Sequence, residues 1–544
     1  MAPAPTTDTA SSASPSQMFS GTGGKPPYAY LREGSLTYSR PLGPTELGCL
    51  LPRGARGYTD TFTIASLACS GGHTITDDEV IHACAALRLR HPLLASTIAF
   101  HPAQPPEFVY ASPLTKAHAL REARAQIEFH TFADQDAAAE ALRDQWLSLD
   151  PEGALDLRYG TCSLYWARDV DPRAGRYIFG LMMAHSVTDG RRKANIVRCM
   201  LELLATPGRA QRVLGAHFAG ETPIVEIPPT LDSLLPDMSK ADPAELAKAK
   251  AAFDEFVKLR RRPLFGFVPD GDAAENNIQP RFVRQTWSTE QTKLILKACK
   301  AQGVTITHFA NAASVFASVQ CASRGAVPPG DSSGSGGSPE DCYYFDLCQA
   351  MDTNAKLPRL SSNGETETAL RCTTYPIVLA VPRAAFASST SDALWDAARQ
   401  YRARHEAYVD SPYLWYFAPF YGAIAAENYM AQMAGGAFIP YVSSLGDMKS
   451  VLPARYPVQP SRAAVNGTAS KTQVVSAEIR VLDQIQTGKA LPHSAAFLLY
   501  TFDDRLNLQF KWNAGHMSDG IMRSFFDRVV EIISQVVDVD EEST

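Results

Sequence analysis

An uninterrupted apolar run at 177–184 (YIFGLMMA) is followed at once by the polar segment His185–Gly190 (HSVTDG). Eight apolar residues in a row are typical of a strand that is buried on both faces of a sheet. Helical periodicity resumes at 195–205. The sequence therefore predicts a central strand, a tight turn and a helix, which favours a mixed α/β fold.

His185 stands where this strand is expected to end, so a rigid element would hold a ring that can face a cavity. An imidazole with a pKa near 6.5 is a workable base at neutral pH. Asp189 lies across the turn and can hold it through backbone N–H groups or an arginine, while Gly190 permits a tight turn. The alternative interpretation is a chance HxxxDG match around a structural histidine, which the motif alone does not exclude.

Strand and helix patterns alternate along both halves of the chain. The expected strands are 58–67, 97–100, 108–111, 161–168, 177–184, 283–288, 341–347, 369–381, 437–443, 473–480, 494–501 and 506–512. The expected helices are 77–90, 136–147, 195–205, 243–259, 289–301, 305–322 and 521–537. Because 544 residues are too many for one compact core, we expect two lobes.

Composition places the lobe boundaries. The expected units are a disordered segment at 1–26, a first lobe at 27–230, a connection with a helix at 231–280, a second lobe at 281–538 and an acidic tail at 539–544. Residues 206–240 are rich in Pro and Gly and are expected to form a surface connection, and 323–340 a flexible loop within the second lobe.

Charge and cysteine usage exclude several classes of function. The net charge is −6 and basic runs are missing, so a nucleic-acid partner is not expected. The clusters 191–193 and 260–262 are interpreted as solvated helix ends, although the first could also lie near an anionic ligand. Ten cysteines without a CxxC pair, together with no HExxH motif, favour reduced thiols and no metal site. With no apolar run of membrane-spanning length, we expect a cytoplasmic monomer without an integral membrane segment.

Several further stretches match one superfamily in its expected order. They are RHPLLAS at 90–96, RPLG at 40–43 with Glu46, GVTIT at 303–307, SSLGD at 443–447, and the closing FLLYTFDDRLNLQFKW. With the HxxxDG motif, they resemble the condensation/chloramphenicol-acetyltransferase-like acyltransferase superfamily. Among its branches, the chain looks most similar to fungal alcohol O-acetyltransferases of the trichothecene 15-O-acetyltransferase group, which act in secondary metabolism.

The resemblance implies two lobes in an α+β sandwich with an active-site tunnel between them. It implies an acetyl-CoA or acyl-CoA co-substrate, no tightly bound cofactor, and a small-molecule hydroxyl acceptor such as a terpenoid alcohol or a glycolipid. His185 would be the general base, with no covalent intermediate, and Asp189 would orient the loop by pairing with an arginine, for which Arg40 is the candidate. Ser443 or Ser444 would support the reaction, unless either serine only caps a strand.

The chain departs from parts of the family pattern. Condensation domains carry a second histidine where Ala184 stands here, and the DFGWG segment of plant-type members is missing. A second motif, His516–Gly520 (HMSDG), is one residue short and is interpreted as structural. The aromatic segment 411–422 is either lobe core or a wall for an apolar acceptor. A condensation enzyme that uses carrier-bound acyl groups and a catalytically silent binding protein both remain alternatives.

Overall fold

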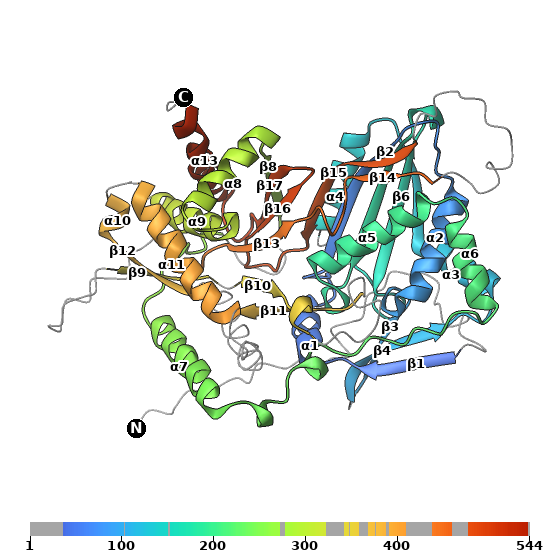
Figure 1. The fold of residues 1–544 in the computed structure, drawn as a ribbon, viewed down its shortest axis with the longest axis horizontal. Coiled ribbons are helices and arrows are strands. Elements are labelled where there is room, and N and C mark those ends of the chain that lie inside the picture. The colour runs from blue at the N-terminus through green and yellow to red at the C-terminus, as the bar shows by residue number, and fades with distance from the viewer. Residues whose placement is uncertain are drawn as a thin grey trace, which may run out of the picture.

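The structure is a computed structural model in which two mixed β-sheets lie side by side (Figure 1). It describes residues 36–541, apart from 103, 149, 151–152, 272–277, 323–341, 348, 358–367, 376, 388–390, 410–437 and 460–476. The first lobe is built on a six-stranded sheet in the order β14-β15-β2-β7-β6-β5. The second lobe is built on a four-stranded sheet in the order β13-β16-β17-β8. The expected two-lobed α/β architecture is therefore confirmed.

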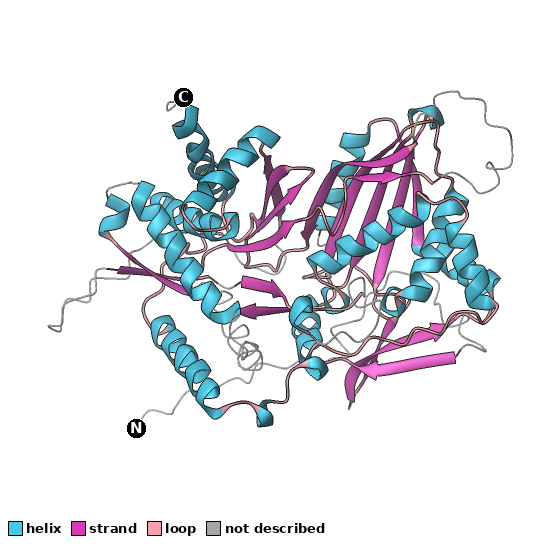
Figure 2. Ribbon diagram, viewed as in Figure 1, coloured by secondary structure: helices cyan, strands magenta, loops and turns pink. Residues whose placement is uncertain are grey.

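The apolar run is strand β7 (Arg176–Met183), which lies inside the first sheet between β2 (Thr61–Cys69) and β6 (Cys162–Asp169). Its alternate side chains enter two different apolar layers. Ile178 and Met182 pack with the residues of helix α4 (Gln135–Leu147), whereas Phe179 and Leu181 belong to the larger core on the opposite face. Helices cover both faces of the sheet (Figure 2), so residues 177–183 of this strand are buried and apolar, and only Arg176 at its start is exposed.

Strand β15 (Glu478–Gly488) joins the first sheet although it comes from the last part of the chain. It pairs antiparallel with β2, and β14 (Arg455–Pro457) pairs with its other side. Figure 1 shows β15 beside β2. The expected boundary of the second lobe at 281–538 is thus wrong for these two strands, because a pairing between residues more than 400 positions apart leaves no local pattern in the sequence.

The second sheet carries the closing strand pair, β16 (Ala496–Phe502) and β17 (Arg505–Asn513), with β8 (Pro280–Thr286) and β13 (Tyr441–Asp447) at its edges. Its apolar face packs on helices α8 (Thr289–Ala301), α9 (Ile306–Ala322) and α13 (Asp519–Glu541). Strand β17 alternates strictly, so that Leu506, Leu508, Phe510 and Trp512 enter this core. Its polar residues consequently face the first lobe.

The remaining elements surround the two sheets. They are β1 (Leu36–Pro41), α1 (Pro44–Leu50), β3 (Thr97–His101), β4 (Gln104–Ser112), α3 (Lys116–Gln126), α6 (Arg209–Phe218), α7 (Pro243–Arg260), β9 (Cys342–Asp346), β10 (Gln349–Asp352), β11 (Cys372–Tyr375), β12 (Val378–Pro382), α10 (Ala384–Ala387) and α11 (Ser391–Val409). Strand β5 (Ile127–Phe132) is instead the edge of the first sheet, beside β6. Helix α6 corrects the surface connection expected at 206–240, because Ala210 and Leu214 bury one side of it against α2 (Asp77–Arg90).

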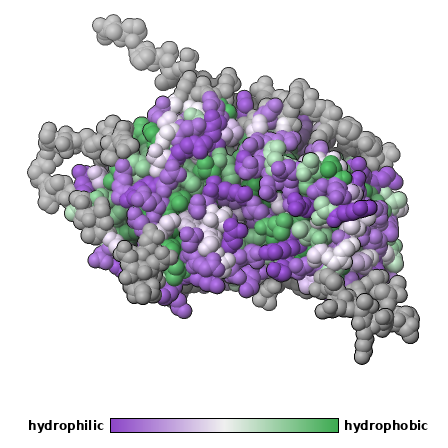
Figure 3. Space-filling view, turned by 90° about the horizontal axis from the view of Figure 1, so that it is seen from above, coloured by the Kyte–Doolittle hydropathy of each residue, from purple (hydrophilic) through white to green (hydrophobic). Residues whose placement is uncertain are grey.

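The surface carries no extended apolar belt on the face seen from above, where polar and apolar residues are interspersed (Figure 3). Within the described part of the chain, no helix combines the length and the hydropathy needed to cross a membrane.

Candidate active site

His185 opens a short 3₁₀ turn directly beyond the end of β7. Its neighbours Ala184, Ser186 and Val187 are buried, whereas His185 itself stays partly exposed. The Nδ1 atom of the ring is buried and has no hydrogen-bond partner among the described residues. The other ring nitrogen, Nε2, is not among the buried side-chain atoms that lack a partner.

The surroundings of His185 favour its neutral form. Burial lowers the pKa of the ring below its ordinary value of 6.5, and the cations Lys193 and Lys511 lower it further. The histidine's own backbone carbonyl and the carboxylate of Asp189 act in the opposite direction. A neutral imidazole at neutral pH is the form that a general base requires.

Asp189 forms the N-cap of helix α5 (Gly190–Leu204) and ties this helix to the second lobe. Its Oδ1 accepts a hydrogen bond from the backbone N–H of Arg192 at 2.9 Å, and its Oδ2 accepts one from the backbone N–H of Arg371 at 3.1 Å. Burial raises the pKa of Asp189, and the Arg192 guanidinium opposes this shift. The carboxylate therefore holds the turn that carries His185, and its hydrogen bonds point away from the ring.

Position 190 has no room for a side chain, so a glycine is required there. A Cβ atom at this position would lie 2.5 Å from the side chain of Leu445 in β13. The φ of Gly190 is not positive, so the turn does not use the left-handed region. The close approach brings the 443–447 segment against the start of α5.

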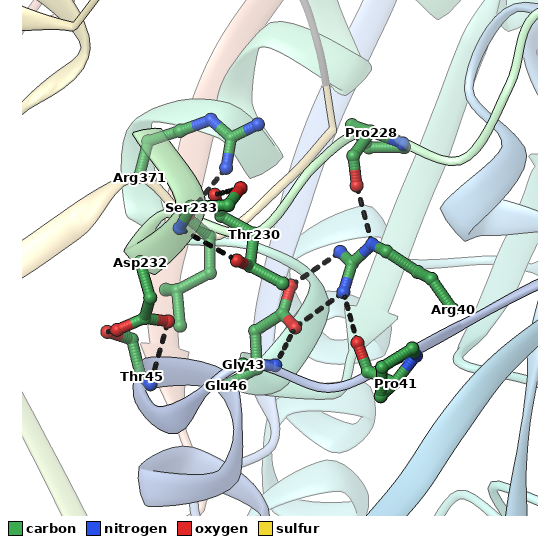
Figure 4. A network of polar contacts seen from close by, with 11 residues as sticks. Arg40, Pro41, Gly43, Thr45, Glu46, Pro228, Thr230, Asp232, Ser233 and Arg371 are labelled. Atoms are coloured by element: carbon green, nitrogen blue, oxygen red, sulfur yellow. Dashed lines mark hydrogen bonds and ion pairs between the residues drawn. The ribbon is translucent and has the colours of Figure 1, made fainter. Parts of the chain in front are cut away.

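Arg40 does not pair with Asp189, because Glu46 is its carboxylate partner. Two guanidinium nitrogens donate to the two Glu46 oxygens at 2.8 and 2.7 Å, and Nε donates to the carbonyl of Pro228 at 2.6 Å. Figure 4 shows the arginine held between Glu46 and Pro228. The expected pairing was wrong because the sequence contains a nearer carboxylate, and Arg40 instead fastens β1 to α1 and to the 228–234 connection.

The basic cluster 191–193 forms contacts between the lobes and is not a solvated helix end. Arg191 lies 3.4 Å from a carboxylate oxygen of Asp352 in β10, and Arg192 lies 3.6 Å from the other oxygen. Arg191 also donates to the carbonyl of Leu445 at 2.6 Å. Three segments of the second lobe thus fix the first turn of α5, directly after the candidate base.

The two candidate serines lie on β13 and are half-buried. Ser444 shares a hydrogen bond of 2.7 Å with the hydroxyl of Thr307, near the start of α9. This partner occupies the Ser444 hydroxyl in the described structure. A supporting role for Ser443 or Ser444 stays a prediction.

Sequence reasoning missed a polar layer between the lobes. Gln509 donates to the Tyr500 hydroxyl at 2.7 Å and to the Gln484 carbonyl at 3.3 Å, and Lys511 donates to the carbonyl of Gly488 at 2.5 Å. The signal that could have found it is the period-two alternation of RLNLQFKWN at 505–513, whose polar positions needed a partner outside the second core.

The shorter motif lies in the second lobe, where its histidine is enclosed by other side chains. Nδ1 of His516 lies 3.2 Å from Nδ1 of His493, and its ring stacks on Phe438. Burial and, to a smaller extent, the neighbouring His493 together lower the pKa of His516 to about 4. Asp519 is engaged by Trp512 and Arg281. These contacts support the structural interpretation of 516–520.

Two other expectations concern a metal site and the aromatic segment 411–422. The described residues contain no group of three or more His, Cys, Asp or Glu side chains that could hold a metal ion. The aromatic segment 411–422 lies outside the described residues.

Comparison with known proteins places the fold. No family model matches the sequence, and no curated protein matches it. The solved TRI3 trichothecene 15-O-acetyltransferase from Fusarium sporotrichioides is similar with a TM-score of 0.69 and 17% identity, over 92% of this chain and 95% of that one. SgcC5 from Streptomyces globisporus is similar with a TM-score of 0.55 and 14% identity, over 92% of this chain and 99% of that one. The epimerization domain from the third module of tyrocidine synthetase B is similar with a TM-score of 0.55 and 11% identity, over 93% of this chain and 98% of that one.

Proposed function

We propose that this chain, which has the two-lobed fold of the condensation and chloramphenicol-acetyltransferase-like acyltransferases, transfers an acyl group from acyl-CoA to a hydroxyl group. The observation that carries the proposal is the position of His185. It stands at the end of a buried strand, stays partly exposed itself, and has a buried Nδ1 that lacks a partner among the described residues. Both lobes hold the turn on which it lies.

In the proposed reaction, Nε2 of His185 removes the hydroxyl proton of the acceptor while the acceptor oxygen attacks the thioester carbonyl. The tetrahedral intermediate collapses by breaking the C–S bond. The imidazolium then returns its proton to the leaving thiolate, which gives free CoA and the ester. Such acid–base assistance contributes roughly 10²–10⁴-fold, and no bond between enzyme and acyl group forms.

Asp189 acts in this scheme as a positioning residue. Its carboxylate accepts two backbone N–H groups, one at the start of α5 and one in the approach to β11. Because both oxygens are occupied in this way, it does not relay the proton. Its contribution is to keep the turn, and with it the His185 ring, in one orientation.

The finer assignment is an acetyl transfer from acetyl-CoA to a secondary-metabolite alcohol, such as a terpenoid alcohol or a glycolipid. The similarity over nearly the full length to a trichothecene 15-O-acetyltransferase supports it. The alternative is a condensation reaction with a carrier-bound acyl donor, which the similarity to the condensation domain of the polyketide synthase MokA favours.

The test is release of free CoA thiol from acetyl-CoA by the purified protein with a panel of alcohols, with the ester identified by mass spectrometry. His185→Ala should remove most of the turnover while the protein stays folded. His516→Ala is the matched control, since it removes a buried histidine from a similar turn and should keep the activity per folded molecule. Turnover of His185→Ala near the wild-type rate would refute the assignment of the base, and transfer from acyl-carrier donors alone would favour the alternative.

A further inference from the structure

Two lysines from different lobes reach the same end of strand β15. Lys511, on β17 of the second lobe, donates to the carbonyl of Gly488 at 2.5 Å. Lys193, on α5 of the first lobe, donates to the hydroxyl of Thr61 at 2.5 Å and lies 3.5 Å from the carbonyl of Thr487. The two ammonium groups therefore contact adjacent carbonyl groups of one strand.

This end of β15 is also the end at which His185 lies. Gly488 pairs with Thr61, and Thr61 pairs with Met183, so these three residues form one row across β15, β2 and β7. Neighbouring strands are about 4.8 Å apart, so Gly488 lies about 10 Å from Met183. His185 follows Met183 by two residues, and the Lys511 charge lowers the pKa of His185, so the two groups lie close enough to interact electrostatically.

The two lysines differ in what their N–H groups reach. Lys193 is 1% exposed, and its ammonium has three protein oxygens within hydrogen-bonding distance: those of Thr61, Phe62 and Thr487. Lys511 is only half-buried and donates to one carbonyl oxygen, so N–H groups remain for a ligand. Among the described residues, neither lysine forms an ion pair with a carboxylate.

An ammonium that is partly shielded from water, as that of Lys511 is, is costly without a carboxylate partner, because the lost hydration of its charge is not offset. Burial lowers the pKa of Lys511 to about 8, which leaves the group largely protonated at neutral pH. The proposed reaction adds a second positive charge when His185 accepts a proton nearby. An anionic group bound at Lys511 would offset both the desolvation of this ammonium group and the positive charge that His185 gains.

We propose that Lys511 binds a carboxylate group of the acceptor, so that the preferred acceptor is a hydroxy acid whose hydroxyl group reaches His185. This inference rests on the proposed function, and it narrows the acceptor from alcohols in general to alcohols that also carry a carboxylate. The separation of His185 and Lys511 sets the spacing, so hydroxyl and carboxylate lie at opposite ends of the reacting part of the molecule. A neutral alcohol of the same shape would leave the Lys511 charge unpaired.

The first experiment compares ω-hydroxy acids of increasing chain length with their methyl esters, using acetyl-CoA and the wild-type, Lys511→Met, Lys511→Arg and Lys489→Met proteins. The wild type should prefer the acid at one chain length by about thirtyfold or more in kcat/KM, as expected for a buried charge pair. Lys511→Met should abolish this preference and Lys511→Arg should keep part of it. Lys489→Met is the matched control, because Lys489 is also buried with a pKa of about 8 but has Asp60 nearby. It should leave the preference unchanged.

A wild type that acetylates acids and esters equally, or a Lys511→Met protein that keeps the preference, would overturn the proposal.

The second experiment tests carboxylate binding at Lys511 separately from the acyl-transfer function. The thermal midpoint Tm is measured with 6-hydroxyhexanoate, with its methyl ester and with inorganic phosphate, without acetyl-CoA. Stabilisation by the carboxylate alone, lost in Lys511→Met, supports the site even if no transfer is seen. No stabilisation, or stabilisation by phosphate alone, overturns it.

Discussion

Replacing Asp189 by alanine tests how the turn that carries His185 is held. The side chain caps α5 through the N–H of Arg192 and accepts a second bond from the N–H of Arg371. Loss of an N-cap costs about 1 kcal/mol, and a buried N–H without a partner costs roughly 1–3 kcal/mol. We therefore expect the free energy of unfolding to fall by about 2–4 kcal/mol.

Urea denaturation followed by tryptophan fluorescence measures this loss, and Asp134→Ala is its control. Asp134 caps α4 by accepting one hydrogen bond at 3.0 Å from the N–H of Ala137, and it is exposed. Its removal should cost only the cap, about 1 kcal/mol. Equal losses in the two variants would refute the reasoning, because the bond to the second lobe would then contribute nothing. Lost activity at unchanged stability would instead give Asp189 a direct part in the chemistry.

Two further predictions concern the same turn. Burial lowers the pKa of His185 below 6.5 and the proposed base acts in its neutral form, so kcat/KM should persist as the pH falls below 6.5 and decline only through the lowered pKa. A decline centred above 6.5 would contradict the assignment. Gly190→Ala should destabilise the fold and slow acyl transfer, because its Cβ would meet Leu445, and the second substitution Leu445→Ala should restore part of both. Failure of the double variant to recover would show that the glycine is needed for another reason.

Local elements could be predicted from the sequence because their signals are local. Helices 77–90 and 289–301 are found with the expected bounds, and each begins with a capping box, at Thr76 and Ser288. The run at 177–184 identified β7 because an unbroken apolar run is typical of a strand that is covered on both faces. Because the HxxxDG motif follows this apolar run directly, it placed His185 just beyond the end of β7.

The remaining features depend on contacts between distant residues. The pairing of β15 with β2, the Arg371 bond to Asp189 and the Lys511 contact with Gly488 each join residues from separate parts of the chain. Spacing along the sequence carries no information on such partners. The error over Arg40 has a different origin, because its actual partner Glu46 is a carboxylate only six residues away.

The insertion of β15 next to β2 has a consequence for how the molecule forms. Until residue 488 has been synthesised, β2 would be an edge strand with unpaired backbone groups, and such edges invite association with other chains. Long-range pairing of this kind also slows folding, because a large loop must close before its contacts stabilise it. The first sheet therefore cannot be completed by the segment that contains β2, and its maturation must wait until a strand more than 400 residues further along the chain has been made.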